Sequence, residues 1–442
     1  MSIRKRFSSL LTGPAIALLI GFFAGPIISR LYSPEVFGQY SVLVAIVGLA
    51  SVVVTLRFEN LIPTCKNPVA NYWISISLSL VGSIFIGGVS LVFLTPEETL
   101  FIVSSMILLV LFNSSYYLLI SSNQYYKASS GRAIQATGIF LGQGWLGLNG
   151  SNLLGLMWGE IIGRIFSVFV VIKLVRVPSR SEITCSFLEQ WRVILWLFPS
   201  AIIGSLALQA LPLGMLWSVG PASAGIFILV YRMVVIPNAL ISKVANDSLL
   251  VEFGKFNKNN ISYRNTVSTS MHKLLFMAIG LYGFIGVQGV WIFPIILGEG
   301  WEVSGKIIPW LSLLVGFWSL ASPMAAVFIF LGKANYSFWF SSLDLTNRIF
   351  ALTLGMYYQD IMIATAALSI GGSMVYGLST ACSLLLSGTN IKVVVSEIFW
   401  PLILMIILLI LSTALLLMGY MWLSFIISSL NLMFALWKVV HD

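Results

Sequence analysis

The sequence contains little charge, few cysteines and only two histidines. Of its 442 residues, 9% are charged and 58% are hydrophobic, and the mean hydropathy is +0.98. So little charge excludes a sizeable water-soluble domain and is typical of a chain that lies in a lipid bilayer. The three cysteines are far apart and lack the spacing of metal ligands, so we expect no disulfide and no metal site.

Enzyme motifs are also missing from the sequence. The chain has no GxxxxGK[ST] phosphate loop, no HExxH zinc motif and no GxSxG nucleophile elbow. No loop between its apolar runs is long enough to fold alone. We therefore expect a protein that acts in or across the membrane, that is not an enzyme and that has no cofactor.

Fourteen apolar runs fill the chain from end to end. Each can cross ~30 Å of hydrocarbon as a helix, which predicts an all-α polytopic membrane protein. Twelve spans is the alternative, because 133–149 is short and Gly-rich and the last two runs are separated only by Gly419 and Tyr420. The predicted spans are 11–31, 36–56, 73–95, 99–121, 133–149, 152–174, 193–217, 221–242, 274–297, 307–331, 337–357, 361–386, 398–417 and 420–437.

Basic residues are concentrated in every second predicted loop, on one side of the membrane. With the N-terminus inside, nineteen of the 24 lysines and arginines fall in cytoplasmic segments, and only Arg30 and Lys306 fall outside. This distribution follows the positive-inside rule and predicts that both termini are cytoplasmic. The net charge of +9 therefore reflects membrane topology, and we expect no nucleic-acid partner.

Two stretches of the chain resemble each other. Residues 33–38 (SPEVFG) are followed by Arg57, and residues 220–225 (GPASAG) are followed by Lys243, at an offset of about 187 residues. Turns with Pro and Gly are common between spans, so chance is the alternative to an internal repeat. Repeated lobes are typical of transporters, with the substrate site near the middle of the membrane. The predicted organisation is an N-lobe of six helices (1–174), a cytoplasmic linker (175–192), a C-lobe of six helices (193–386) and a closing helix pair (387–442).

One arginine stands alone in the middle of a predicted span. Arg232 is 11 residues from both Pro221 and Lys243, which is ~16 Å at 1.5 Å per residue, too deep for its side chain to reach either surface. A charge at this depth costs about 2.5–3.5 kcal/mol on insertion scales and faces a cavity or a partner. Arg232 is therefore either a contact for an anionic substrate or a structural arginine bonded to another helix.

Two further spans carry a pair of opposite charges. Glu160 and Arg164, like Asp344 and Arg348, are four residues apart and lie on one face of a helix. Each pair can simply neutralise itself. Alternatively, both pairs face a hydrophilic interior, in which arginine binds phosphate or uronate groups and a carboxylate titrates or binds Na⁺.

Two arginines lie at predicted span ends. Arg30 ends the first span on the outside, where it either lines the outer mouth of a cavity or anchors the helix at the interface. Arg57 lies near Glu59 at the inner end of the second span, where an ordinary ion pair at a helix end is the alternative to a functional role.

The N-terminal segments that contain these arginines resemble a known family. Residues 25–40 (GPIISRLYSPEVFGQY), followed by residues 55–59 (TLRFE), are similar to bacterial polysaccharide flippases, the Wzx-type O-antigen-unit exporters of the multidrug/oligosaccharidyl-lipid/polysaccharide superfamily. The resemblance implies a MATE-like fold with two six-helix lobes around a central cationic cavity. It also implies that the protein flips an undecaprenyl-diphosphate-linked oligosaccharide from the cytoplasmic to the periplasmic leaflet of the inner membrane.

The resemblance assigns roles to the charged residues. Arg30 and Arg57 are at motif positions, and Arg164, Arg232 and Arg348 are candidates for the cavity by their depth. Glu160, Asp344 and Glu59 are candidates for coupling to H⁺ or Na⁺. The implied partners are the lipid-linked oligosaccharide, membrane lipids, and the polymerase and chain-length machinery of the same pathway.

Other functions remain open at this point. A multidrug or cation exporter of the same superfamily would favour an acidic cavity, and three basic against two acidic residues deep in the membrane argue against it. An O-antigen polymerase, a membrane glycosyltransferase, would need a large outside loop, and the longest one here is about 298–306. An assembly protein without transport gives no reason for charges in three separate spans.

Overall fold

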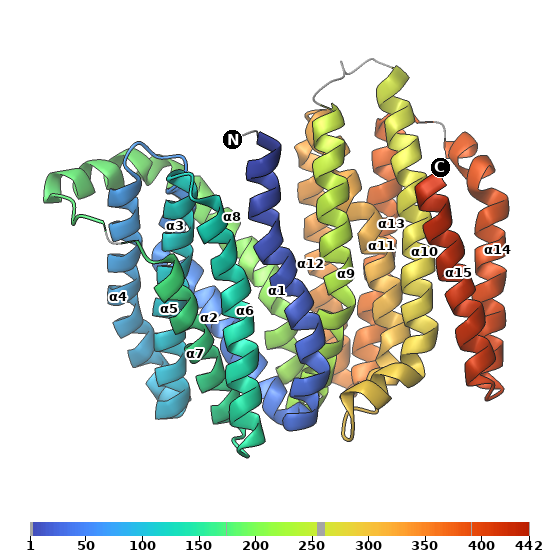
Figure 1. Ribbon diagram of the computed structural model, residues 1–442, viewed down its shortest axis with the longest axis horizontal. Coiled ribbons are helices and arrows are strands. Elements are labelled where there is room, and N and C mark those ends of the chain that lie inside the picture. The colour runs from blue at the N-terminus through green and yellow to red at the C-terminus, as the bar shows by residue number, and fades with distance from the viewer. Residues whose placement is uncertain (1–2, 174, 254–260, 390, 442) are drawn as a thin grey trace. The chain divides into compact units, whose positions relative to one another are not determined.

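Helices form nearly all of the computed structural model (Figure 1). The structure describes residues 3–173, 175–253, 261–389 and 391–441, and this part of the chain contains no strand. The helices are α1 (Ile3–Leu31), α2 (Pro34–Thr55), α3 (Phe58–Leu61), α4 (Pro68–Phe93), α5 (Pro96–Ser121), α6 (Tyr125–Leu148), α7 (Leu153–Val171), α8 (Arg180–Val219), α9 (Pro221–Phe253), α10 (Ile261–Leu297), α11 (Ser304–Phe330), α12 (Ala334–Tyr358), α13 (Ile361–Leu386), α14 (Ile391–Leu417) and α15 (Met421–His441).

Each of the fourteen predicted spans corresponds to one long helix, and the short α3 is the addition. Twelve of these helices are long and apolar enough to cross a membrane, and α6 and α12 are the two outside this set. Both are richer in polar residues, and α12 carries Asp344 and Arg348. The expected loop 243–273 is shorter than predicted, because α9 continues to Phe253 and α10 begins at Ile261, with 254–260 outside the described residues.

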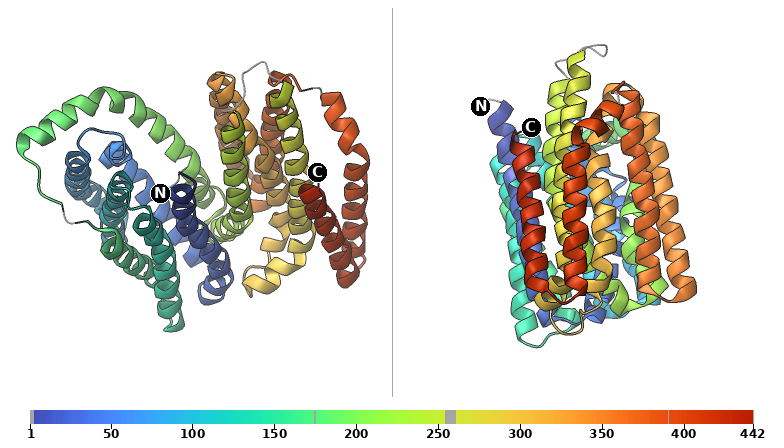
Figure 2. Two further views of the ribbon diagram at one scale, coloured as in Figure 1. Left: turned by 45° about the horizontal axis from the view of Figure 1, so that its top comes forward. Right: turned by 90° about the vertical axis from the view of Figure 1, so that its right-hand side faces the viewer.

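The turns between helices follow from local chemistry. Ser33 caps α2 by accepting a hydrogen bond from the Val36 amide, with proline at the first helical position. Thr95 and Ser179 each form a capping box with a glutamate three residues on. α8 is 40 residues long and curves along its length (Figure 2), and it contains Pro199 and Pro212, which interrupt the hydrogen-bond ladder.

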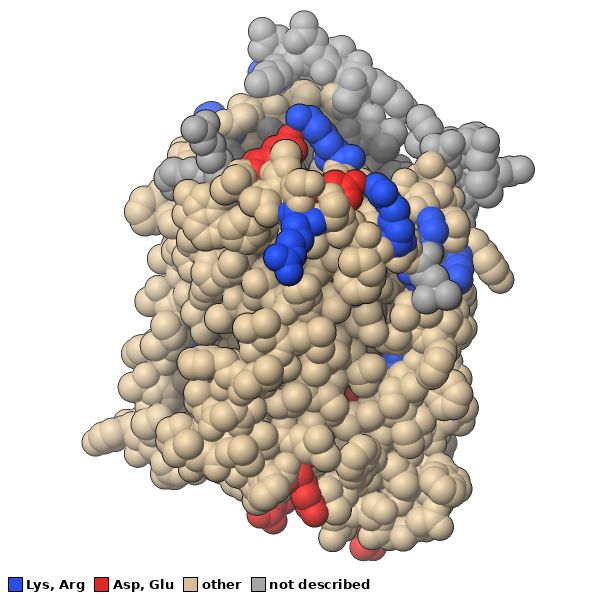
Figure 3. All heavy atoms as spheres, turned by 90° about the vertical axis from the view of Figure 1, so that its left-hand side faces the viewer, with Lys and Arg blue, Asp and Glu red and all other residues tan. Residues whose placement is uncertain are grey.

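The chain forms two compact units, Met1–Ile228 and Leu229–Asp442. In the first unit, α6 packs against α1 and α7, and α2 packs against α4, α5 and α8. On the face of this unit seen in Figure 3, lysines and arginines gather at one end and the band below carries almost no surface charge. The boundary falls inside α9 rather than at the linker 175–192, and the division into lobes 1–174 and 193–386 stays a prediction.

Glycines let α6 and α7 approach closely. Gly138 and Gly142 on α6 face Gly159 and Gly163 on α7, two GxxxG pairs on facing helices. A Cβ atom at Gly159 would clash with the backbone nitrogen of Gln143, and one at Gly163 would clash with that of Ile139. Small residues of this kind replace the hydrophobic effect as the basis of helix association in lipid. The crossing holds Glu160 and Arg164, which directly follow the two α7 glycines.

The two similar stretches meet in the first unit. A Cβ atom at Gly38 would clash with the carbonyl oxygen of Pro221, and one at Gly225 would clash with that of Pro34. Each glycine lies four residues after its proline, so the starts of α2 and α9 contact each other reciprocally. Only residues without a side chain allow the two backbones to come this close.

In the second unit, α11 packs against α10 and α13, and α13 also packs against α12. The closing helices α14 and α15 pack on α10 through a buried polar cluster. The Nε2 of Gln288 donates to Ser424 Oγ at 2.9 Å and to Ser428 Oγ at 2.7 Å, and all three residues are fully buried. Such hydrogen bonds hold helices together in lipid, where an unpaired amide would be costly.

The reciprocal glycine contact generates a stability prediction. Substituting Gly38→Ala places a methyl group against the Pro221 carbonyl, and overpacking of this kind costs about 1–3 kcal/mol. We expect a lower midpoint of thermal unfolding for the purified protein in detergent. The matched control is Gly21→Ala, where an added Cβ has nothing within 4 Å and alanine is the better helix former. An unchanged midpoint for Gly38→Ala would show that α2 and α9 do not make this contact.

Candidate functional site

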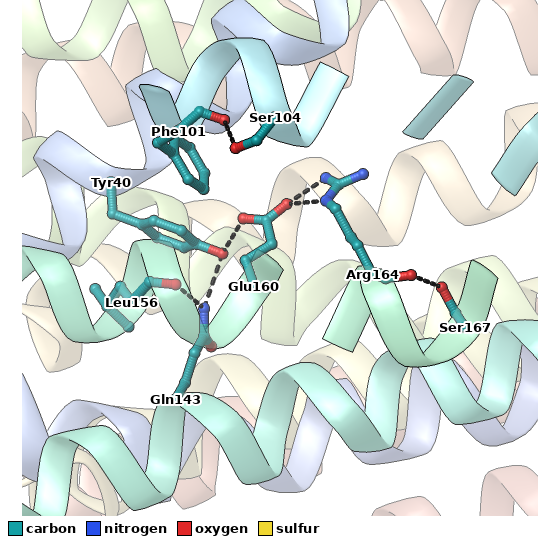
Figure 4. Close-up of polar contacts among 8 residues, drawn as sticks. All are labelled: Tyr40, Phe101, Ser104, Gln143, Leu156, Glu160, Arg164 and Ser167. Carbon is teal, nitrogen blue, oxygen red and sulfur yellow. Dashed lines mark hydrogen bonds and ion pairs between the residues drawn. The ribbon is translucent and has the colours of Figure 1, made fainter. Parts of the chain in front are cut away.

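Glu160 is the centre of a buried network in the first unit (Figure 4). Arg164 donates from Nε to Glu160 Oε1 at 2.8 Å and makes a second contact to the same oxygen from Nη2. On the other side, the Tyr40 hydroxyl donates to Glu160 Oε2 at 2.5 Å. Glu160 and Arg164 are 3% and 7% exposed, so the ion pair is shielded from bulk water. The carboxylate has a partner on both of its oxygens.

The network extends to a third helix, α6, through Gln143. Its Nε2 donates to the Tyr40 hydroxyl at 2.9 Å and to the Leu156 carbonyl at 3.1 Å. Tyr40 therefore donates to the carboxylate and accepts from the amide, and side chains from α2, α6 and α7 form one connected group. The Nη1 of Arg164 is the exception, because it is buried without a hydrogen-bond partner among the described residues.

The second unit contains a network of the same chemistry. Arg348 donates from Nε to Asp344 Oδ2 at 2.8 Å, and the Tyr376 hydroxyl donates to Asp344 Oδ1 at 3.0 Å. Tyr231 on α9 also bonds to the Arg348 side chain. The Tyr376 ring stacks on Trp318 with 6.2 Å between centroids. In both units, tyrosines from neighbouring helices complete an acid–arginine pair on one helix face.

Arg232 differs from these arginines because its side chain is exposed. It forms no ion pair with any residue in the described ranges. A guanidinium in the middle of the span Pro221–Lys243 is tolerated only where water reaches it, since contact with hydrocarbon is costly. The role of Arg232 as a contact for an anionic substrate stays a prediction.

The two arginines at span ends lie in different surroundings. Arg30 is exposed near the end of α1. Arg57 is partly buried and lies 3.8 Å from Glu59, measured from Nη1 to Oε1. It occupies a left-handed backbone conformation with φ of 62°. The predicted ion pair at this helix end is present, but its nitrogen–oxygen distance of 3.8 Å is long.

Arg132 is a residue that sequence reasoning missed, because it was counted among the charges of a cytoplasmic loop. It lies inside α6, with its Cζ 5.0 Å from the ring centroids of both Phe112 and Tyr116. The signal that could have located it is the aromatic pair Tyr116 and Tyr117 on the preceding helix. Cation–π contact holds the guanidinium without cancelling its charge.

The arginines therefore fall into two groups. Arg164 and Arg348 are paired with carboxylates, whereas Arg232 and Arg132 have no carboxylate partner among the described residues. The second group can bind an anion without breaking an existing ion pair. The described residues contain no group of three or more His, Cys, Asp or Glu side chains that could hold a metal ion.

Comparisons with known proteins agree with this membrane architecture. A family model described as "Polysaccharide biosynthesis protein" matches residues 27–306. The chain is similar to a structure of the lipid II flippase MurJ in an inward closed conformation, with a TM-score of 0.66 and 14% identity over 96% of this chain and 97% of that chain. No curated protein sequence matches it.

Two further solved structures share the fold. One is an inward-facing multidrug resistance MATE family transporter of the MOP superfamily, with a TM-score of 0.56 and 13% identity over 88% of this chain and 95% of that chain. The other is a MOP superfamily transporter from Pyrococcus furiosus, with a TM-score of 0.55 and 12% identity over 86% and 94%. The predicted fold class, all-α, polytopic and MATE-like, is confirmed.

The network around Glu160 generates a second prediction. Tyr40→Phe removes the donor to Glu160 Oε2 and one acceptor of Gln143, and leaving buried polar groups unpaired costs about 1–3 kcal/mol. We expect a lower midpoint of thermal unfolding in detergent. Tyr126→Phe is the control, because Tyr126 is 79% exposed and should unfold like the wild type. Equal midpoints for both variants would mean that the Tyr40 hydroxyl does not hold this network.

Proposed function

The chain belongs to the polysaccharide biosynthesis protein family, and from this premise we propose that it flips an undecaprenyl-diphosphate-linked oligosaccharide across the bacterial inner membrane. The family and the structural neighbours are transporters and flippases rather than enzymes. The proposed substrate is an O-antigen unit or a related repeat unit. It moves from the cytoplasmic to the periplasmic leaflet by alternating access.

The exposed side chain of Arg232 is the observation that carries this proposal. It lies in the middle of a span and lacks a carboxylate partner among the described residues. A lipid-linked sugar has an anionic diphosphate, a polar glycan and an apolar tail. The guanidinium offers a planar fork of donors that matches phosphate oxygens. An exposed arginine at this depth offers the charged head a partner while the tail stays in lipid.

The paired arginines support the proposal in a different way. In their ion pairs, Arg164 and Arg348 add no net charge to the interior, and contact with substrate requires that these pairs open. We propose that in the present conformation they fix the helices around the path, and that Arg30 lies at its outer mouth.

Coupling to H⁺ or Na⁺ needs a carboxylate that changes its state. Glu160 and Asp344 have partners on both oxygens. Glu59 has a partner on only one of its oxygens, because its Oε2 is buried without a hydrogen-bond partner. Burial raises the pKa of the Glu59 carboxyl above its usual value, so the group takes up a proton at a higher pH than a solvated glutamate. Of the three candidates, Glu59 is the one we propose for coupling.

A multidrug exporter is the second candidate, because MATE transporters share the fold. Export of cationic drugs favours unpaired carboxylates in the transport path. In the described part of this chain, Glu160 and Asp344 are both neutralised by arginines, and the unpaired deep charge is the cation Arg232. The charge of the interior therefore favours an anionic substrate.

Deleting the gene tests the proposal. We expect lipid-linked repeat units to accumulate on the cytoplasmic side and surface polysaccharide to disappear, as measured by glycan gels and by labelling of whole cells. Wild-type protein should restore display, and Arg232→Ala should reduce it by tenfold or more, since a charged hydrogen bond is worth about 1.5–3 kcal/mol. Arg232→Lys separates the effect of charge from that of the fork geometry.

Arg176→Ala is the matched control for the deletion experiment, because Arg176 is exposed and pairs with Glu182 outside the spans. Its expression and its glycan display should equal those of the wild type. Normal display by Arg232→Ala would contradict substrate contact by Arg232. Normal display by the deletion strain would contradict the proposed function itself.

The proposed orientation makes a separate prediction. A green fluorescent protein fused after Val177, in the turn between α7 and α8, should fluoresce, because we assign that turn to the cytoplasm. Alkaline phosphatase fused after Gly300, in the turn between α10 and α11, should be active in the periplasm. The reverse pattern would place the termini outside and overturn the positive-inside assignment.

A further inference from the structure

The first half of α8 lies outside the membrane span of that helix. α8 has 40 residues, which is ~60 Å of helix at 1.5 Å per residue, whereas the hydrocarbon layer is only ~30 Å thick. The part of α8 that can cross the membrane by length and hydropathy is Ala201–Val219. Figure 1 shows that the earlier part of α8 runs across one end of its unit instead of along the other helices. Residues 180–200 therefore need a place outside the hydrocarbon layer.

One face of this segment packs on α3 and α4. Phe187 stacks on Phe58 with 5.3 Å between ring centroids, and Ile194 is buried in the same hydrophobic cluster as Phe58. The Ser186 hydroxyl donates to Asn71 Oδ1 at 2.7 Å, and both residues are buried. These contacts fix the segment on its unit and decide which of its faces remains uncovered.

The partners of the segment indicate its depth in the membrane. Lys66, which lies two residues before the span Pro68–Phe93, has its Nζ 2.6 Å from Glu189 Oε1. Ile74, six residues inside that span, is in the same hydrophobic cluster as Ile194. Six residues of helix rise ~9 Å. The segment therefore extends from just outside the span to ~9 Å inside it, which is the depth at which interfacial helices lie.

An apolar stripe on the segment is not covered by any described part of the chain. It consists of Leu188, Trp191 and Leu195, which follow one another at helical spacing and are 66%, 40% and 54% exposed. An exposed apolar surface of this kind marks a contact with a membrane or with a protein. Because the segment lies at the depth of the headgroups and continues directly into a span, the surface that the stripe meets is lipid. Tryptophan is enriched at this level of the bilayer.

The charges of the segment match an anionic lipid surface. Arg180 lies two helical turns before Leu188 on the same side of the helix. It is exposed and has no ion-pair partner among the described residues. Residues 173–192 contain four basic and two acidic residues, and the two glutamates pair with Arg176 and Lys66. The remaining positive charge attracts anionic headgroups.

We propose that residues 180–198 form an interfacial helix that binds anionic lipids. The apolar stripe inserts between the acyl chains, and Arg180 contacts headgroup phosphates at the shallower end of the stripe. Pro199 interrupts the hydrogen-bond ladder where α8 passes from the surface into the bilayer. The partner is the membrane surface itself, so the proposal goes beyond the proposed function and does not depend on its substrate.

Fluorescence quenching in lipid nanodiscs tests the contact. The full-length protein, with its three native cysteines replaced by serine, carries one bimane label at Leu188→Cys or, as the matched control, at Glu189→Cys. We expect lipids with a nitroxide on the acyl chain to quench the label at position 188 severalfold more than the label at 189. Iodide in the water should show the reverse order, because Glu189 faces Lys66 outside the span.

The choice between two quenching lipids tests the role of Arg180. At equal mole fraction, nitroxide-labelled phosphatidylglycerol should quench the label at position 188 about twofold more than nitroxide-labelled phosphatidylcholine, since basic residues near the surface attract anionic lipid. Arg180→Gln should reduce this difference. Lys306→Gln is the control, because it removes an exposed basic residue of the other unit, and it should leave the difference unchanged.

Three outcomes would overturn the interfacial helix. Equal acyl-chain quenching at positions 188 and 189 would show that the stripe does not face lipid. Protection of position 188 from both quenchers would show that protein covers it. Equal quenching by the two lipids would contradict binding of anionic headgroups. If Glu189→Cys fails to fold, the native Cys185, which is exposed outside the stripe, takes its place as the labelled control. The gene deletion succeeds or fails independently, because no readout here involves transport.

Discussion

A charge inside a membrane must either meet an opposite charge or be reached by water, and this constraint decides where the deep polar groups of the chain lie. Glu160 with Arg164 and Asp344 with Arg348 meet the first condition, and tyrosines satisfy the remaining oxygens. Arg232 differs, because its side chain is exposed and has no carboxylate partner among the described residues. The arginines of the described residues therefore differ in whether a carboxylate neutralises their charge.

Matching charges across helices requires helices that approach closely. The glycines of α6 and α7 bring Gln143 near enough to reach the Leu156 carbonyl, and the reciprocal contact of Gly38 and Gly225 brings the starts of α2 and α9 together. In lipid, packing and hydrogen bonds hold helices together, because hydrocarbon solvates apolar side chains as well as another helix does. Residues that carry no side chain are for this reason as important to the polar networks as the residues that form them.

The buried arginines of the described residues are held in two different ways. Those in complete ion pairs stabilise one arrangement of helices. Arg132 instead lies against the rings of Phe112 and Tyr116, which leave its charge uncancelled.

The fourteen helices, the Ser33 cap and the two i,i+4 pairs were predictable from the sequence, because hydropathy, capping and helical spacing act over short stretches of chain. The motif near the N-terminus also predicted the family. The tyrosine partners were not predictable, since Tyr40 and Glu160 are 120 residues apart. The exposure of Arg232 and the contact of Arg132 with Phe112 and Tyr116 likewise depend on which helices pack together. Local composition determined that these charges lie in the membrane, and only tertiary contacts decided which of them are neutralised and which remain available.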